Sequence, residues 1–113
     1  GENSLLYLSA SWCQPCIEAV DSVQKAIRLL KERNPFSMRI FSLESDNSKQ
    51  LELEKIYGKE NVYILENASE HPLAKYFNVN SVPTIIILKN KRIQSRNLIS
   101  PLELPGYINR IKH

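Results

Sequence analysis

The chain has 113 residues, of which 42% are hydrophobic and 24% charged, as expected for one globular domain with a single core. Its 15 basic and 12 acidic residues give a net charge of +3 and are interspersed, so the broad basic stripe typical of nucleic-acid-binding proteins is absent and we expect no nucleic-acid partner. No apolar run approaches the roughly 20 residues that span a bilayer, so we expect no direct membrane insertion, and two cysteines are too few for a multi-disulfide framework.

The start of the chain carries no signal-peptide pattern, and Gly1 is typical of a tag-cleavage scar or of the edge of an excised domain. A removed leader or anchor is compatible with this start, so the missing leader does not imply a cytosolic protein. Because no repeats, linkers or low-complexity tracts interrupt the chain, residues 1–113 are expected to form one domain.

Strand and helix patterns alternate in the first half. Residues 4–10 form a mostly apolar run, typical of a strand buried on both faces. Helical spacing follows from Gln14 to Arg33, and Asn34-Pro35 ends that helix. Residues 38–43 predict a second strand. The apolar stripe of the helix consists of Ile17, Val20, Val23, Ala26, Ile27 and Leu30.

A short helix is expected within residues 45–58, where Gly58 ends it. A short strand at 61–65 and a helical stretch at 68–77 follow, with Pro72 near the first turn of that helix. The inner face of the helix within 45–58 is expected to include Leu51, Leu53 and Ile56.

The end of the chain predicts a hairpin and a helix. Residues 84–99 form two strands across an Asn90-Lys91 turn, and the basic run at 89–92 is interpreted as the solvated tip of that hairpin. A capping box of Ser100 and Glu103, with Pro101 in the first turn, begins the last helix. Pro105 and Gly106 fit a helix interior badly, which moves the expected helix start toward Pro105.

This order of elements indicates an α/β fold. Alternating strands and helices favour a mixed, mainly parallel central sheet, flanked by helices on both faces and joined by right-handed crossovers. The terminal hairpin adds the antiparallel part.

Cys13 and Cys16 lie at the corner between the first strand and the first helix. Free backbone N–H groups at a helix start favour a thiolate, which is the reactive form of cysteine. Two intervening residues allow the sulfurs to reach disulfide distance. Cys13, at the mouth of the turn, is expected to be the exposed attacking thiol, and Cys16 the buried one that resolves the mixed disulfide. Pro15 suits the first turn, where its missing N–H is not needed.

Two other interpretations of the pair remain open from the residues alone: a zinc or copper site, and an incidental pair of small buried residues. A structural zinc requires four ligands, and the two histidines, His71 and His113, are placed on a helix and at the chain end, where surface positions are expected. We therefore predict no metal site.

The stretch 80–87 places Pro83 immediately before an apolar strand. Proline in a central strand removes a ladder hydrogen bond, so Pro83 is expected to begin the strand and to shape the preceding turn. From these residues alone the Val82–Pro83 bond can be trans or cis, and the cis form is the less common one.

Together, the strand leading into Trp-Cys-Gln-Pro-Cys and the later Val-Pro-Thr resemble the thioredoxin superfamily over nearly the whole chain. The resemblance implies that Cys13 is the nucleophile, Cys16 the resolving thiol and Pro83 a cis-proline facing them. It also implies that the backbone of Val82 binds a substrate chain in strand-like pairing. The residues expected to shape the surrounding site are Trp12, Gln14, Pro15 and Thr84.

Residues 47–67 add a helix and a short strand after the second strand, as in bacterial thiol–disulfide oxidoreductases of the TlpA/ResA type. That group implies a reductant working outside the cytoplasm, periplasmic or tethered to the membrane. The leading strand of the family is absent from this chain or was cut away.

One departure concerns the proton relay. Tyr7 stands where thioredoxin has a buried carboxylate, and tyrosine cannot replace it at neutral pH. Position 19, where some ResA-like proteins carry glutamate, is Ala19. Glu18 and Asp21 are the nearby acids, so they are the candidate relay residues, with a solvated or helix-dipole role as the alternative.

The sequence therefore predicts a thiol–disulfide oxidoreductase that reduces disulfides of partner proteins, needs no organic cofactor and is re-reduced by a donor protein. A non-catalytic thioredoxin-fold module of a larger protein, a metal carrier and a thiol peroxidase are the alternatives.

Overall fold

The computed structural model describes residues 3–32, 36–67, 70, 72, 75 and 81–110. The described residues form a mixed five-stranded sheet in the order β3-β2-β1-β4-β5. β1 is parallel to β2, and β2 to β3, whereas β4 is antiparallel to both β1 and β5. The expected α/β fold is confirmed. The strands are β1 (Asn3–Ser9), β2 (Phe36–Glu44), β3 (Val62–Glu66), β4 (Thr84–Lys89) and β5 (Arg92–Arg96).

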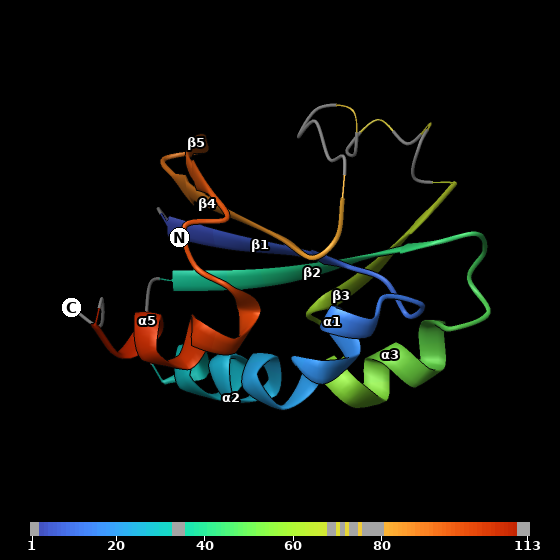
Figure 1. The fold of residues 1–113 in the computed structure, drawn as a ribbon, viewed down its shortest axis with the longest axis horizontal. Helices are drawn as coiled ribbons and strands as arrows, with labels where there is room; N and C mark the ends of the chain where they lie inside the picture. Colours follow the sequence, from blue (N-terminus) through green and yellow to red (C-terminus); the bar gives the residue numbers. More distant parts are fainter. Residues whose placement is uncertain are drawn as a thin grey trace.

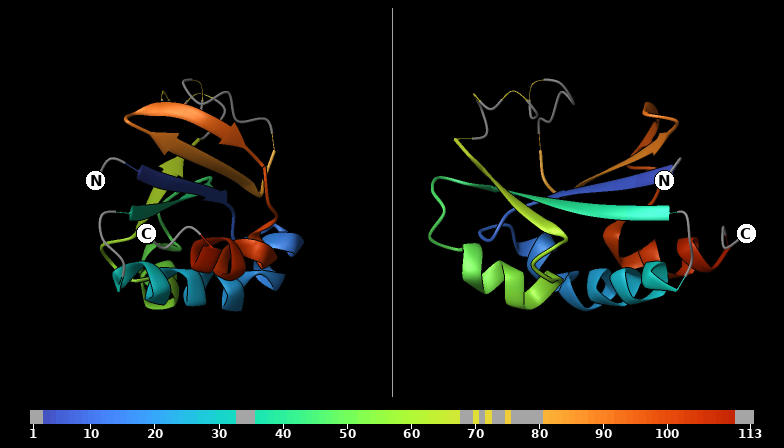
Figure 2. Two further views of the ribbon diagram at one scale, coloured as in Figure 1. Left: turned by 90° about the vertical axis from the view of Figure 1, so that its left-hand side faces the viewer. Right: turned by 180° about the vertical axis from the view of Figure 1, so that it is seen from behind.

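Helices α2, α3 and α5 all lie on one side of this sheet (Figures 1 and 2). The helix expected at 68–77 lies outside the described residues apart from Glu70, Pro72 and Lys75. Of these three residues, Pro72 and Lys75 have helical backbone conformation. The helices are α1 (Gln14–Glu18), α2 (Val20–Lys31), α3 (Gln50–Tyr57) and α5 (Leu104–Arg110), which follows the 3₁₀ turn η1 (Pro101–Glu103).

β1 is buried on both faces, as its apolar run predicts. Its side chains alternate, so Leu5 and Tyr7 join the main core between sheet and helices, while Leu6 and Leu8 join a smaller cluster with Ile86. The main core also contains Val23, Ala26, Ile27, Ile40, Leu53, Leu104 and Ile108.

The single helix expected from Gln14 to Arg33 is broken at Ala19. The Ala19 N–H donates to the Cys16 carbonyl, three residues back, at 3.2 Å, and the Ala19 carbonyl accepts from Val23 at 2.9 Å as α2 begins. The break restarts the helical phase. Ile17, expected in the buried stripe, is therefore 49% exposed.

α3 begins later than the sequence pattern suggests. The Asp46 carboxylate accepts from the Ser48 N–H at 2.9 Å and holds a turn before the helix, and Gly58, with φ of +96°, ends it as predicted. Leu53 is buried, but Leu51 is 73% exposed, so its inward assignment was wrong. Two residues correspond to about 200° around a helix, which places these leucines on opposite faces.

The hairpin turn is confirmed at Asn90 and Lys91, whose φ values of +53° and +66° suit a two-residue hairpin turn. The basic run at 89–92 is exposed at this tip. β5 ends at Arg96, three residues earlier than expected.

The capping box before the last helix is also confirmed, with the Ser100 N–H donating to Glu103 Oε1 at 3.0 Å. α5 itself starts at Leu104, so Pro105 and Gly106 fall in its first turn.

The packing of α5 against the core predicts that replacing a buried aliphatic residue lowers the stability of the protein much more than replacing an exposed one nearby. Ile108 is fully buried, so Ile108→Ala is expected to lower the free energy of unfolding by about 2–5 kcal/mol in urea titration. Leu102, which is 62% exposed, is the matched control, and Leu102→Ala should change it by less than about 0.5 kcal/mol. Equal effects of the two substitutions would contradict this packing.

Candidate functional site

The two cysteines form a disulfide at the junction of β1 and α1. The Cys13 N–H donates to the Ala10 carbonyl at 3.3 Å, which closes the turn after β1. Cys13 is the N-cap of α1, and its Sγ accepts from the Cys16 N–H at 3.3 Å. In general, a backbone N–H directed at a cysteine sulfur stabilises the thiolate more than the thiol.

Both cysteines are buried in this disulfide form, Cys13 with 5% and Cys16 with 2% of its surface exposed. The expectation of an exposed Cys13 was therefore wrong for the oxidised pair. Ala10 is in the same buried cluster, and Leu43 and Val82 pack against it.

The Val82–Pro83 peptide bond is cis, as expected. Val82 packs on the cluster that contains both cysteines, which places this loop against the disulfide. The Thr84 hydroxyl donates to the Ser81 carbonyl at 2.6 Å, and Thr84 is the β4 register partner of Leu8 near the end of β1. Strand pairing thus brings the loop at 81–83 to the cysteines, which lie far earlier in the chain.

The side chains that flank the pair lie at the surface. Trp12 is 68% exposed, and its indole Nε1 donates to the Leu43 carbonyl at 3.2 Å. Gln14 and Pro15 are exposed at the start of α1.

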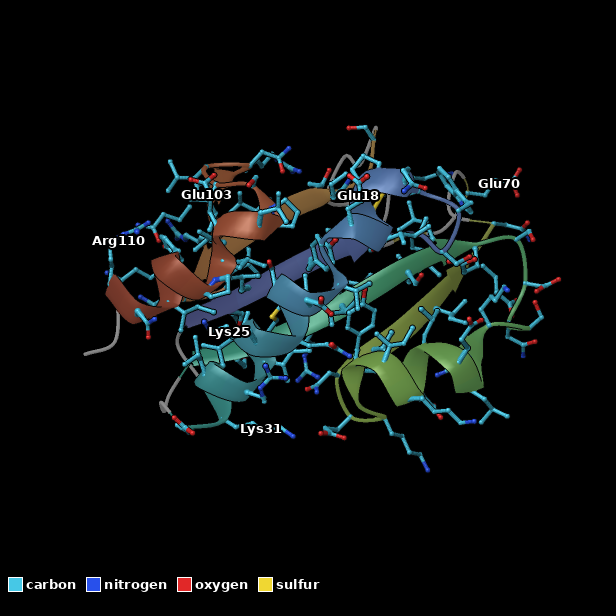
Figure 3. All side chains as sticks on the ribbon, turned by 60° about the horizontal axis from the view of Figure 1, so that its bottom comes forward. Glu18, Lys25, Lys31, Glu70, Glu103 and Arg110 are labelled. Carbon is cyan, nitrogen blue, oxygen red and sulfur yellow. A yellow bond between two sulfur atoms is a disulfide. The ribbon has the colours of Figure 1, made fainter. Side chains whose placement is uncertain are left out.

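The two candidate proton-relay acids are exposed as well. Glu18 projects from α1 and accepts from the Gln14 amide at 3.5 Å (Figure 3). Asp21 is in the first turn of α2.

Glu44 is a site residue that sequence reasoning missed. It is only 8% exposed at the end of β2, and it accepts hydrogen bonds from the Ser11 backbone and hydroxyl and from the Ser42 hydroxyl. The predicted strand ends at residue 43, so Glu44 lies just outside it. The sequence did contain one signal for a buried acid. Ser11 follows the apolar run 4–10 and Ser42 interrupts the strand at 38–43, and each is a hydroxyl donor at a position where an apolar residue would extend the run.

Buried hydroxyls lie in and near the main core, on the helix side of β1. Burial raises the pKa of Tyr57 to about 12, with a further increase from the neighbouring Tyr7. Burial also raises the pKa of Tyr7, which the Ser9 hydroxyl lowers by a smaller amount. Among the described residues the Tyr7 hydroxyl has no hydrogen-bond partner of ordinary geometry. Neither tyrosine can act as a base at neutral pH.

No group of three or more metal-ligating side chains occurs in the described part of the chain, and His71 and His113 lie outside it. Within the same residues, no helix is long and apolar enough to cross a membrane.

A Cys-x-x-Cys disulfide against a cis-proline loop on this sheet defines a thioredoxin-like fold of the thiol–disulfide oxidoreductase type. Residues 1–93 match the family model described as Thioredoxin-like, so the chain belongs to that family. It is 33% identical over 94 residues to Thioredoxin 2 of Plasmodium falciparum, a match that covers 81% of this chain and 42% of the relative. The chain thus spans less than half of that relative's length.

Solved structures share the fold. A thiol-disulfide oxidoreductase from Bacteroides fragilis superposes with a TM-score of 0.78 at 23% identity, covering 97% of this chain and 81% of the other. A secreted disulfide oxidoreductase of Mycobacterium tuberculosis superposes with a TM-score of 0.73 at 12% identity, covering 97% and 82%. The resemblance to the thioredoxin superfamily is confirmed, and these structures are bacterial oxidoreductases of the kind the sequence resembles.

The raised tyrosine pKa values predict a loss of stability in alkali. The folded state keeps Tyr57 protonated up to about pH 12, whereas the unfolded chain releases this proton near its ordinary value of 10.0. The contribution of Tyr57 to the free energy of unfolding is therefore fully present below pH 10.0, and it is lost as the pH rises toward 12. Tyr57→Phe cannot ionise, so it should lose less stability than the wild type between about pH 9 and about pH 11 in urea titrations. The exposed Tyr63→Phe is the control, and an equal benefit from it would contradict the assignment.

Proposed function

We propose that the chain is a thiol–disulfide oxidoreductase that reduces disulfides of partner proteins with the Cys13–Cys16 pair. The observation that carries the proposal is the position of Cys13: it caps α1, its sulfur accepts the Cys16 N–H, and the Val82 loop packs against it. In this arrangement one cysteine is held as a nucleophile, the second is one helical turn away, and a backbone segment lies beside both.

The reaction begins with the reduced pair. The Cys13 thiolate attacks one sulfur of the partner's disulfide, so a Cys13–partner disulfide forms while the other partner sulfur leaves as a thiolate and takes up a proton. Cys16, after losing its proton, attacks Cys13 Sγ, which closes the Cys13–Cys16 disulfide and expels the second partner sulfur. Two electrons pass from the pair to the partner. A dithiol donor protein reduces the pair again, and no organic cofactor takes part.

Substrate recognition is assigned to the surface around the pair. An extended partner segment would add to the Val82 backbone in strand-like pairing, ahead of Pro83 and Thr84, while the exposed Trp12, Gln14 and Pro15 contact its side chains. The exposed Trp12 ring supplies a large apolar contact at little entropic cost.

The proton of Cys16 is proposed to leave through Glu18 or Asp21. Glu18 is exposed on α1, which starts at the pair, and Asp21 is exposed in the first turn of α2, which follows it, so each can exchange a proton with solvent. The buried Tyr7 is excluded from this role at neutral pH by its raised pKa.

We further propose that residues 1–113 work as a single thioredoxin-like domain outside the cytoplasm. The similarity to a secreted disulfide oxidoreductase supports this location. Detection of the protein in the extracytoplasmic fraction of its source cell tests it, and recovery with cytosolic markers alone would refute it.

Cysteine variants test the mechanism directly. Cys13→Ser is expected to abolish reduction of a protein disulfide, at least a hundredfold by order of magnitude, because the nucleophile is lost. Cys16→Ser should accumulate a mixed disulfide with the substrate, visible on non-reducing gels and released by dithiothreitol. If Cys13→Ser keeps full turnover, the mechanism is wrong. If the wild type shows none, the chain is a non-catalytic binding module.

The direction of electron flow is tested by the reduction potential of the pair. Equilibration with glutathione should give a value near that of thioredoxin, roughly −270 mV, as expected for a reductant. A value near about −120 mV would instead define an oxidant.

A further inference from the structure

Glu44 is a nearly buried carboxylate beside the redox pair that the mechanism above does not use. Its Oε2 accepts from the Ser11 N–H at 2.7 Å and from the Ser42 hydroxyl at 2.7 Å, and its Oε1 accepts from the Ser11 hydroxyl at 2.6 Å. Three donors on one acid at 8% exposure form a satisfied buried site, not a solvated surface charge.

The backbone of Glu44 is also held in place. Glu44 is the last residue of β2, and its carbonyl accepts a hydrogen bond from the N–H of Asn67, the residue after β3, at 3.1 Å. The side chain therefore reaches the active-site turn from a fixed point in the sheet.

The segment that Glu44 holds leads directly to the nucleophile. Ser11 is two residues before Cys13, and Trp12 between them is bonded through its indole to the Leu43 carbonyl, next to Glu44. The end of β2 thus contacts both residues that precede Cys13. If the backbone at Ser11 were conformationally free, the position of Cys13 would also vary, and the hydrogen bond from the Cys16 N–H to the Cys13 sulfur would weaken.

We propose that Glu44 is a positioning residue of the redox site, which through Ser11 fixes the turn that presents the Cys13 sulfur to the Cys16 N–H. This rests on the proposed function in that Cys13 is the nucleophile. Glu44 acts through the turn and does not itself touch the reacting sulfurs in this assignment.

The hydrogen-bond pattern allows geometry to be separated from charge. The backbone N–H and the Ser42 hydroxyl share Oε2, so the single amide oxygen of glutamine can accept both. Among the described residues Oε1 accepts only from the Ser11 hydroxyl, which can turn to accept from a glutamine NH₂. Glu44→Gln therefore keeps all three bonds without the charge, whereas Glu44→Ala loses bonds and charge together.

The experiment compares these two variants through the pKa of the Cys13 thiol, followed by thiolate absorbance in the reduced protein. Glu44→Ala is expected to have a Cys13 pKa about one unit above that of Glu44→Gln, a tenfold smaller thiolate fraction at the same pH, because only alanine frees the turn. Glu66, the exposed register partner of Glu44 on β3, supplies the control: Glu66→Ala and Glu66→Gln should give the same pKa.

Equal Cys13 pKa values in Glu44→Ala and Glu44→Gln would overturn the proposal, as would an equal difference in the Glu66 pair. If Glu44→Ala does not fold, Ser11→Ala replaces it. That variant keeps the backbone bond and loses the hydroxyl, so its thiolate fraction should fall about threefold relative to Glu44→Gln; no fall refutes the proposal. The measurement uses no partner protein, so failure of reductase activity cannot be mistaken for failure of this assignment.

Discussion

The pairing of β1 on both of its edges is the constraint on which the site depends. β1 runs parallel to β2 and antiparallel to β4, so the end of β1 lies beside the end of β2 and the beginning of β4. The register fixes this meeting point, with Ser9 opposite Ser42 and Leu8 opposite Thr84. The cysteine turn, Glu44 and the cis-proline loop converge for that reason, although they come from three separate parts of the sequence.

The neighbourhood of the disulfide has an apolar and a polar part, and each has its own physical role. Ala10, Leu43 and Val82 bury the disulfide and exclude water, which strengthens any hydrogen bond made to a sulfur there. Beside them, Glu44 satisfies the polar groups of the turn, so that the chain can be buried without orphaned donors. At the surface beside the pair lies Trp12, whose indole nitrogen is held by a hydrogen bond although most of the side chain is exposed to solvent.

Much of this organisation follows from local sequence signals, because these act over a few residues. The apolar run before Cys13, the Asn90-Lys91 turn and the Ser100 capping box each encode a conformation that tertiary contacts do not oppose. The helix break at Ala19 is different, because alanine is a good helix former and carries no signal for it. Leu51 was misassigned because apolar character alone does not give the phase of a short helix.

The sequence by itself determined the strand–helix order and the place of Cys13 and Cys16 at a helix start, since each depends on spacing within one segment. The cis bond before Pro83 was expected only because the sequence resembles the thioredoxin superfamily. Only the tertiary structure decided that both cysteines are buried when oxidised, that Val82 covers them and that Glu44 holds Ser11. Burial and hydrogen-bond partners depend on which strands lie side by side. That choice is made by the packing of the whole sheet, which no short stretch of residues contains.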